Sequence, residues 1–533
     1  MSVRWDEVSL EEFAGRDLVP QVDCLADYVD YWAERTPAAL FDRDGQVDRN
    51  YDQAASEIAA CAKALAAAGV VPGDRVAVLS DPRPEFITIL AALGRVGAVW
   101  VGLNPAYTFG ELEHVLADAS PKLAFTIASY RESEIAADFV ALARQNGVEQ
   151  TIVLGSSANS GTVGWDEFIG QGKSVETAPA VVLAESDPAL IVYTSGSTGR
   201  PKGAVISHGA FTAGCYLQAS KYFHREARVI AYLPINHVAG LLDLGGVPIA
   251  MGGSLHYLRQ FDPAELLAMT AKDKITMWGG VPTVMQFAAG HPDWAKTDFS
   301  SLEYLAWGGS PMPAELVPIL RATGARLGAV YGLTESCVAF TYSDANATDE
   351  QLASTIGRPD PRLDFRIDGG DGPGELLLKN PCLMTEYLNQ PEATAATFTP
   401  DGYLRTGDLA QMRPDGLIEI VGRLKEMFKS GGYNVYPREV ELAIEEHEAV
   451  ETVVVVPVPD ERFHEVGVAF VVLAQASSSS VTADVLREHC RARLAAYKVP
   501  KRFELVDRLP QISIGKIDRS ALRRLAAEAA KRP

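Results

Sequence analysis

The stretch YTSGSTGRPKG, residues 193–203, directly follows the short apolar run 189–192, which is typical of a buried strand. Glycine lets a backbone approach a ligand closely, Ser and Thr hydroxyls donate hydrogen bonds, and Lys202 adds a positive charge. The stretch therefore predicts a loop that holds phosphate groups. It is not a Walker P-loop, because Pro201 precedes the lysine and Gly203 stands where Ser or Thr is required. A flexible surface loop is the simpler alternative.

The length and charge of the chain limit its class. Its 533 residues exceed what one hydrophobic core usually holds, so we expect two or more domains. The net charge of −21 repels nucleic acids and anionic membrane surfaces, so we expect neither as a partner. A bound nucleotide would therefore depend on local positive groups.

The cysteines and the apolar segments indicate a cytoplasmic protein. The six cysteines form no CxxC pair and no zinc-like spacing with histidines, which favours reduced thiols. The N-terminus lacks the basic and apolar pattern of a signal peptide. The most apolar stretch, 86–103, is interrupted by Arg95 and by glycines, so it predicts a buried helix and a strand instead of a membrane span. The oligomeric state stays open, with a homo-oligomer among the alternatives.

Helix and strand patterns alternate in the first half of the chain, and its strands are fully apolar. This alternation is typical of parallel sheets covered by helices, an α/β fold. After Arg423 the pattern is that of a compact α+β unit. The sequence predicts helices at 52–67, 84–96, 438–446, 482–494 and 519–530, and strands at 75–79, 98–101, 453–456 and 466–473.

The glycine-rich stretch resembles the signature loop of the adenylate-forming superfamily, which contains acyl- and aryl-CoA ligases, peptide-synthetase adenylation domains and beetle luciferase. The resemblance extends over nearly the whole chain. It implies an N-terminal domain, residues 1–424, with parallel-sheet layers, helices and a small barrel-like part. It also implies a small α+β C-terminal domain, residues 425–533, which serves as a mobile lid.

The resemblance also implies which loop residues bind ATP and Mg²⁺. Thr198 would be a metal ligand and a catalytic residue. The phosphate loop would contribute Thr194, Ser195, Gly196, Ser197, Thr198, Gly199 and Lys202, and the turn that faces adenine would contribute Gly308, Gly309 and Ser310.

The segment YGLTE, residues 331–335, combines an aromatic ring, a hydroxyl and a carboxylate. Such a set suits a nucleotide, because a ring stacks on a base and a carboxylate is a hard oxygen ligand for magnesium. By resemblance, Tyr331 stacks on adenine beside Gly332, Thr334 contacts the α-phosphate, and Glu335 binds Mg²⁺ as a catalytic residue. A helix N-cap formed by Thr334 is the simpler alternative.

Asp408 can accept hydrogen bonds from both hydroxyls of a ribose, and the resemblance gives it that role. Lys425 matches the hinge of the lid. Further contacts with the nucleotide or with coenzyme A are implied for Ile420, Arg423, Gly431 and Gly432.

Lys516 matches the catalytic lysine of the family, which bridges the carboxylate of the acid and the α-phosphate. The reaction needs such a group because a carboxylate attacks a polyphosphate, anion against anion. Ile514 stands where the family usually has Thr, and a solvated surface lysine is the simpler alternative. His237 matches an aromatic gate beside the acid, with a core histidine as its alternative.

The acid pocket is implied to include His237, Trp307, Val338, Ala339 and Phe340. The family usually has a small residue at the position of Trp307, so an indole there predicts a short, flat or cyclic acid. A core tryptophan is the alternative. No aspartate directly follows His237, and Asp243 lies further along, which disfavours an amino acid substrate but leaves it as an alternative.

The implied reaction is that of an acid–CoA ligase. ATP and a carboxylic acid give an acyl-adenylate and pyrophosphate, and coenzyme A then displaces AMP. Transfer to a carrier protein, a luciferase-like oxygenase and a non-catalytic nucleotide-binding homologue remain as alternatives. The sequence does not name the acid.

Overall fold

The computed structural model describes residues 19–155, 162–178, 181–194, 201–222, 227–370, 372–430, 433–460, 462–474, 481–511 and 517–530. The chain divides into two compact units. The first unit comprises Met1–Asp364 and Leu378–Leu404, and the second comprises Phe365–Leu377 and Arg405–Pro533. The predicted boundary between residues 424 and 425 is the point about which a lid would rotate, not a limit between compact units, and it stays a prediction.

The first unit contains a nine-stranded sheet whose centre is parallel, as the apolar strand pattern predicts. Its outer pairs β1–β2, β16–β17 and β17–β18 are antiparallel. In spatial order its strands are β18 (Arg358–Pro359), β17 (Ala339–Tyr342), β16 (Arg326–Gly332), β15 (Tyr304–Trp307), β14 (Met277–Gly280), β12 (Arg228–Ala231), β13 (Ser254–Tyr257), β1 (Leu40–Asp44) and β2 (Val47–Asn50).

An eight-stranded sheet forms the second layer of this unit, and it is also parallel except at one edge. Its strands in order are β21 (Glu386–Tyr387), β11 (Lys202–Ser207), β10 (Pro188–Thr194), β4 (Val99–Leu103), β3 (Arg75–Leu79), β5 (Leu123–Ile127), β8 (Gln150–Leu154) and β9 (Val163–Gly164). The predicted strand 75–79 is confirmed as β3, and the predicted helix 84–96 is confirmed as α4 (Pro84–Val96). This helix ends where Gly97 adopts a left-handed conformation, with φ of 68°.

The second unit contains an open four-stranded sheet of β19 (Asp364–Asp368), β20 (Gly374–Lys379), β22 (Leu404–Met412) and β23 (Ile418–Arg423). This sheet takes the place of the expected barrel-like part. A further sheet contains β24 (Phe428–Ser430), β25 (Tyr433–Val435), β26 (Val450–Asp460), β27 (His464–Leu473) and β28 (Arg502–Leu505).

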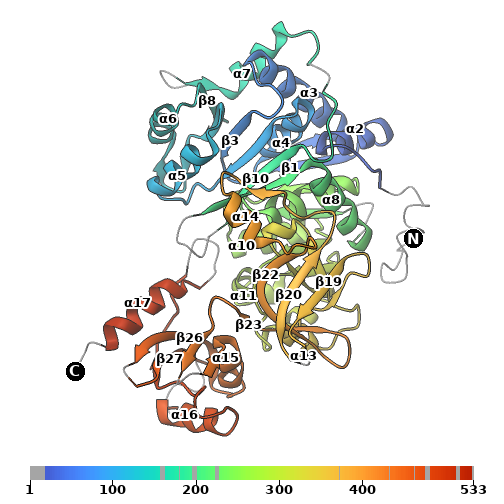
Figure 1. Cartoon of the computed structure of the whole chain (residues 1–533). Coiled ribbons are helices and arrows are strands. Elements are labelled where there is room, and N and C mark those ends of the chain that lie inside the picture. Colours follow the sequence, from blue (N-terminus) through green and yellow to red (C-terminus); the bar gives the residue numbers. More distant parts are fainter. Residues whose placement is uncertain are drawn as a thin grey trace. The chain divides into compact units, whose positions relative to one another are not determined.

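Period-two alternation in β26 gives this sheet two buried faces. Val453 and Val455 pack with α15 (Pro437–Glu445) and α16 (Ala483–Arg491), whereas Val454 and Val456 pack with α17 (Arg519–Ala530). Figure 1 shows β26 and β27 between these helices. The α+β pattern predicted for this part of the chain is confirmed.

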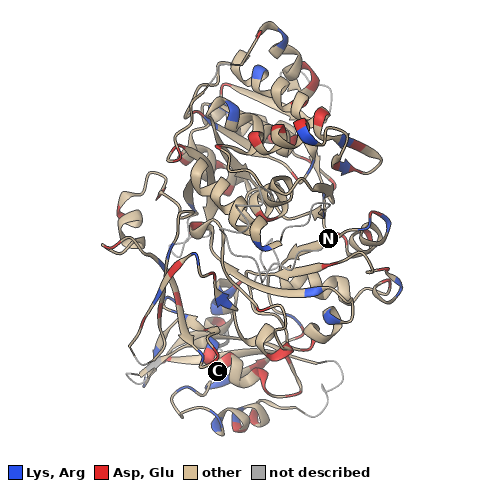
Figure 2. Cartoon of the chain, turned by 90° about the vertical axis from the view of Figure 1, so that its right-hand side faces the viewer, with Lys and Arg blue, Asp and Glu red and all other residues tan. Residues whose placement is uncertain are grey.

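The cysteines agree with the prediction of reduced thiols, since all six are free and buried. Within the described ranges no helix is long and apolar enough to cross a membrane. Basic residues lie scattered among acidic ones along the coloured ribbon (Figure 2).

Candidate active site

The strand order of the nine-stranded sheet brings several predicted residues to one edge. Strands β12, β14, β15 and β16 are parallel neighbours, so their carboxyl ends lie together. Ligands in open α/β sheets bind at such an edge. His237 follows β12, the Gly308 turn follows β15, and the segment 331–335 spans the end of β16. The sheet therefore gathers residues that lie about a hundred positions apart in the chain.

The phosphate loop joins two antiparallel strands, with Thr194 of β10 paired to Lys202 of β11. The hydroxyl of Tyr193 donates to Asp118 Oδ2 at 2.7 Å, and His114 Nε2 lies 2.9 Å from the carbonyl oxygen of Pro201. Thr194 and Lys202 are half-buried at the ends of this hairpin. The loop residues Ser195, Gly196, Ser197, Thr198 and Gly199 lie outside the described residues.

The segment that carries Glu335 forms a short 3₁₀ turn, Thr334–Ser336, after β16. The backbone N–H of Leu333 donates to Ser336 Oγ at 2.9 Å, and that hydroxyl lies 3.0 Å from the carbonyl oxygens of Leu333 and Val338. Thr334 and Glu335 are half-buried. The buried Ser336 therefore fixes the turn, whereas Thr334 and Glu335 stay partly accessible.

Tyr387 connects Glu335 to the phosphate hairpin, and sequence reasoning missed it. Its hydroxyl donates to Glu335 Oε1 at 2.6 Å, and Lys202 Nζ lies 5.1 Å from the centroid of its ring. Strand pairing places Tyr387 opposite Ala204 of β11. The sequence carried no signal for this contact, because Tyr387 is separated from Glu335 by 52 positions.

The turn after β15 depends on its two glycines. Gly309 has a φ of 81°, which favours glycine, and a Cβ on Gly308 would lie 3.0 Å from the carbonyl oxygen of Val330. Gly309 and Ser310 are exposed, and Tyr331 on the next strand is half-buried. The turn therefore packs closely against β16 and leaves Gly309 and Ser310 at the surface.

His237 lies in a turn fixed by its neighbours. Its carbonyl oxygen accepts from the N–H groups of Gly240 and Leu241, each at 3.1 Å. The preceding Asn236 is buried, and its Nδ2 donates to the hydroxyl of Tyr107 at 2.8 Å. His237 itself is half-buried.

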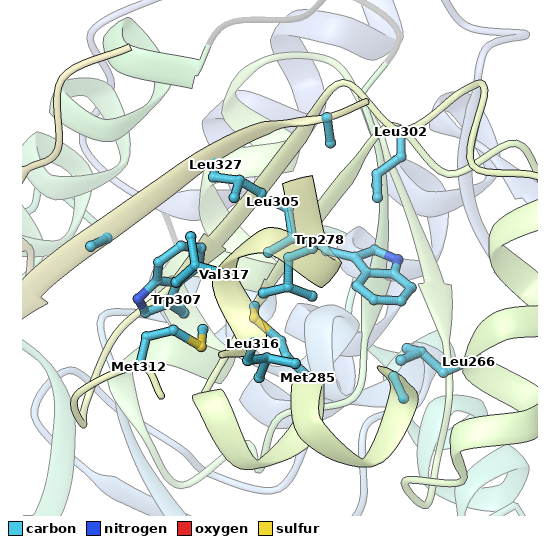
Figure 3. Packing of buried hydrophobic residues seen from close by; sticks show 14 of the residues in the cluster. Leu266, Trp278, Met285, Leu302, Leu305, Trp307, Met312, Leu316, Val317 and Leu327 are labelled. Carbon is cyan, nitrogen blue, oxygen red and sulfur yellow. The ribbon is translucent and has the colours of Figure 1, made fainter. Parts of the chain in front are cut away.

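The predicted acid-pocket residues Trp307, Val338, Ala339 and Phe340 are all buried. Trp307 is 2% exposed and packs in a hydrophobic cluster with Met312, Leu316 and Val317, as Figure 3 shows. This placement is what the core-tryptophan alternative describes. A role of Trp307 in the pocket stays a prediction.

Asp243 lies in the π-helix η3 (Ala239–Gly246), a type of element that often marks functional positions. Gln218 Nε2, on helix α8 (His208–Tyr222), donates to Asp243 Oδ1 at 2.5 Å. Burial raises the pKa of Asp243 to about 7. Sequence reasoning used Asp243 only to argue against an amino acid substrate.

The second unit brings Asp408 and Arg423 together. They are paired across β22 and β23, and Arg423 Nε lies 2.8 Å from Asp408 Oδ1. The carboxylate side chain is 3% exposed and the guanidinium side chain 59%. Ile420 is half-buried on β23 and Lys425 is exposed after it, whereas Gly431 and Gly432 lie outside the described residues.

Lys516 also lies outside the described residues, but both ends of its loop are fixed. Gln511 and Ile517 form a β-bridge, and Asp518 Oδ1 accepts from the N–H of Ala521 at 2.8 Å at the start of α17. Arg519 Nη2 lies 2.9 Å from Oε1 of Glu441, a buried carboxylate on α15.

The Mg²⁺ ion that the resemblance implies fits the side chains present at this site. In the described ranges no three His, Cys, Asp or Glu residues are grouped to hold a metal ion. Magnesium is usually bound by one or two carboxylates together with substrate phosphates and water. Glu335, next to the phosphate hairpin through Tyr387, is a suitable single carboxylate.

Comparisons with known proteins identify the family of the chain. The family model described as AMP-binding enzyme matches residues 29–388, and that of the AMP-binding enzyme C-terminal domain matches residues 439–516. The chain is 35% identical to feruloyl-CoA synthase of Amycolatopsis sp, over 92% of this chain and 97% of that protein. It is 31% identical to indoleacetate–CoA ligase of Aromatoleum aromaticum, over 94% and 98% respectively.

The crystal structure of ATP-bound MatB from Rhodopseudomonas palustris is similar throughout, with a TM-score of 0.82 and 27% identity over 95% of this chain and 100% of that chain. The α/β fold with a large N-terminal and a small C-terminal domain is thereby confirmed. The chain therefore belongs to the AMP-binding enzymes of the adenylate-forming superfamily, and it is an AMP-forming acyl-CoA synthetase.

Proposed function

We propose that this enzyme uses ATP and Mg²⁺ to activate a flat or cyclic carboxylic acid and then transfers the acyl group to coenzyme A through the residues named above. The observation that carries the proposal is the carboxyl edge of the nine-stranded sheet, where His237, the Gly308 turn and Glu335 follow the parallel strands β12, β15 and β16. Glu335 and Lys202 contact the same tyrosine there.

In the first half-reaction a carboxylate oxygen of the acid attacks the α-phosphorus of ATP, and the bond to pyrophosphate breaks. Lys516 and Lys202 oppose the charge that builds up on the phosphates. Glu335 and Thr198 would hold Mg²⁺, which lowers the repulsion between the phosphates and the acid when bound.

In the second half-reaction the thiol sulfur of coenzyme A attacks the acyl carbon of the adenylate, and AMP leaves. Asp408 holds the ribose, and Arg423 beside it balances the charge of this carboxylate. Lys425 serves as the hinge of the lid, and Gly431 and Gly432 line the path of the thiol arm.

The names of the relatives support an aromatic acid, because two of them are a feruloyl-CoA synthase and an indoleacetate–CoA ligase. A long-chain-fatty-acid–CoA ligase of Mycobacterium tuberculosis is 32% identical and supports the competing assignment. AMP formation from aromatic, cyclic and straight-chain acids, with and without coenzyme A, distinguishes the two. Preference for the longest chains would exclude a flat or cyclic substrate.

The six free, buried cysteines support action in a reducing compartment such as the cytoplasm.

Two variants separate the half-reactions. Lys516→Ala should reduce adenylation by roughly 10²–10³ and spare thioester formation from supplied acyl-adenylate. Lys425→Pro should form acyl-adenylate but lose thioester formation, because proline fixes φ near −65° at the hinge. Equal losses in both half-reactions would contradict the assignment of Lys516, and undiminished thioester turnover in Lys425→Pro would place the hinge elsewhere.

A further inference from the structure

The segment that carries Tyr387 is held against both parts of the predicted phosphate and metal site. The N–H of Met384 donates to the carbonyl oxygen of Glu335 at 2.9 Å. The N–H of Leu388 donates to the carbonyl oxygen of Gly203 at 2.8 Å. The backbone around Tyr387 therefore joins the turn of Glu335 to the strand that leaves the phosphate loop.

The side chain of Tyr387 repeats this connection. It is 8% exposed, its hydroxyl donates to Glu335 Oε1 at 2.6 Å, and its ring lies under the ammonium group of Lys202. The N–H of Tyr387 donates to Thr394 Oγ1 at 2.9 Å, which fixes the backbone from which the ring projects. One buried side chain thus contacts a predicted metal ligand and a predicted phosphate ligand.

We infer that Tyr387 is a positioning residue that orients the carboxylate of Glu335 for a divalent cation and holds Lys202 for the phosphates. The inference rests on the proposed role of Glu335. A hydroxyl on Oε1 fixes the rotation of the carboxylate and adds no positive charge, so the attraction for a cation is retained. The ring attracts the ammonium group of Lys202 through its negative face.

The test uses Mn²⁺ as a probe for the cation and measures binding instead of turnover. Tyr387→Phe keeps the ring beside Lys202 and removes the hydroxyl. We expect the dissociation constant of Mn²⁺ from the complex with ATP, measured by electron paramagnetic resonance without acid, to rise about tenfold. The affinity for AMP without metal should not change.

Tyr257→Phe is a matched control. Tyr257 is also buried, and its hydroxyl lies 3.2 Å from a carboxylate oxygen, Asp42 Oδ2. Asp42 has no proposed role in the site. This variant should bind Mn²⁺ like the unmodified enzyme. Equal weakening in Tyr257→Phe and Tyr387→Phe would mean general destabilisation and would overturn the inference.

Glu335→Gln separates the inference from the function on which it rests. Unchanged Mn²⁺ binding in Glu335→Gln would refute the metal role of Glu335 itself. Weaker binding in Glu335→Gln with unchanged binding in Tyr387→Phe would refute only the positioning role. If Tyr387 acts through Glu335, adding Tyr387→Phe to Glu335→Gln should weaken binding no further.

Discussion

Glu335 and Asp408 are both carboxylates predicted to contact the nucleotide, one in each unit, and they are held differently. A tyrosine hydroxyl donates to Glu335 at 2.6 Å. A guanidinium nitrogen lies 2.8 Å from Asp408. In the described residues Glu335 makes no salt bridge, whereas the charge of Asp408 is balanced by Arg423.

The difference indicates what each carboxylate can bind. A cation is attracted by a carboxylate whose negative charge is not cancelled, so a neutral donor suits Glu335. A ribose hydroxyl needs an oriented acceptor and little net charge, so an arginine partner suits Asp408. The chemistry of the partner therefore supports the metal role for one carboxylate and the sugar role for the other.

The largest effect should come from removing the charge at Glu335. Glu335→Gln should reduce adenylation by roughly 10²–10³, because a cation on the phosphates loses its carboxylate. Asp408→Asn should weaken ATP binding and the preference for ATP over 2′-deoxy-ATP, and leave the Mg²⁺ requirement unchanged. Pyrophosphate release across a Mg²⁺ titration measures both. A shifted Mg²⁺ requirement in Asp408→Asn would break the comparison.

A second arginine-held carboxylate in the same unit shows what full burial adds. Glu441 is 2% exposed at its side chain, and it accepts from Arg519 and from the N–H of Val455 at 2.9 Å. Arg519→Met should lower the free energy of unfolding by about 3 kcal/mol, since the buried charge then keeps only the longer contact to Arg438 Nη1, at 3.6 Å. Chemical denaturation of this variant and of Arg519→Met/Glu441→Gln measures the effect. Equal stability of the single and double variants would contradict it.

Local chemistry explains why much of the fold could be predicted from the sequence. The helix 84–96 begins with proline and ends before Gly97, so its ends were visible without tertiary information. Strand β26 is longer than the predicted 453–456 because it continues through Pro457 and Pro459 to Asp460. Within the described residues β26 pairs only with β27, so it is an edge strand. An edge strand accepts prolines because the missing N–H is not needed for pairing on its open side.

The candidate site was less predictable where it depends on contacts between distant segments. The segment 331–335 combines its ring, hydroxyl and carboxylate within five positions, and it was found from sequence. Tyr387 reaches Glu335 only because β21 pairs with β11, which no local pattern reveals. The size of Trp307 likewise suggested a pocket wall, whereas its surroundings are a hydrophobic cluster.

A third carboxylate, Asp243, extends the comparison because its partner is a neutral amide, Gln218. Burial raises its pKa to about 7, whereas an unfolded Asp has a pKa of about 3.9. Between these values the folded protein binds more protons than the unfolded protein. Stability should therefore fall as the pH rises from about 4 to about 7, with each pKa unit corresponding to about 1.4 kcal/mol.

Asp243→Asn keeps an oxygen acceptor for Gln218 and removes the titration. Melting temperatures of both proteins, measured from pH 5 to pH 8, should diverge, and the variant should gain relative to the unmodified enzyme as the pH rises. Parallel curves would show that Asp243 does not titrate in this range.

The smallest effect should follow loss of the positive charge beside Asp408. The Arg423 side chain is 59% exposed, so water screens its interaction and the pair should contribute about 1 kcal/mol or less. Arg423→Gln should therefore raise the KM for ATP no more than about fivefold, with an unchanged Mg²⁺ requirement. Since the loss arises from an unbalanced charge on Asp408, the same substitution should have less effect in an Asp408→Asn background. Steady-state kinetics of the four proteins measures this coupling. Additive losses would mean that Arg423 acts on the nucleotide directly. Arg423 would then not serve to balance the charge of Asp408, and the comparison with Glu335 would lose its basis.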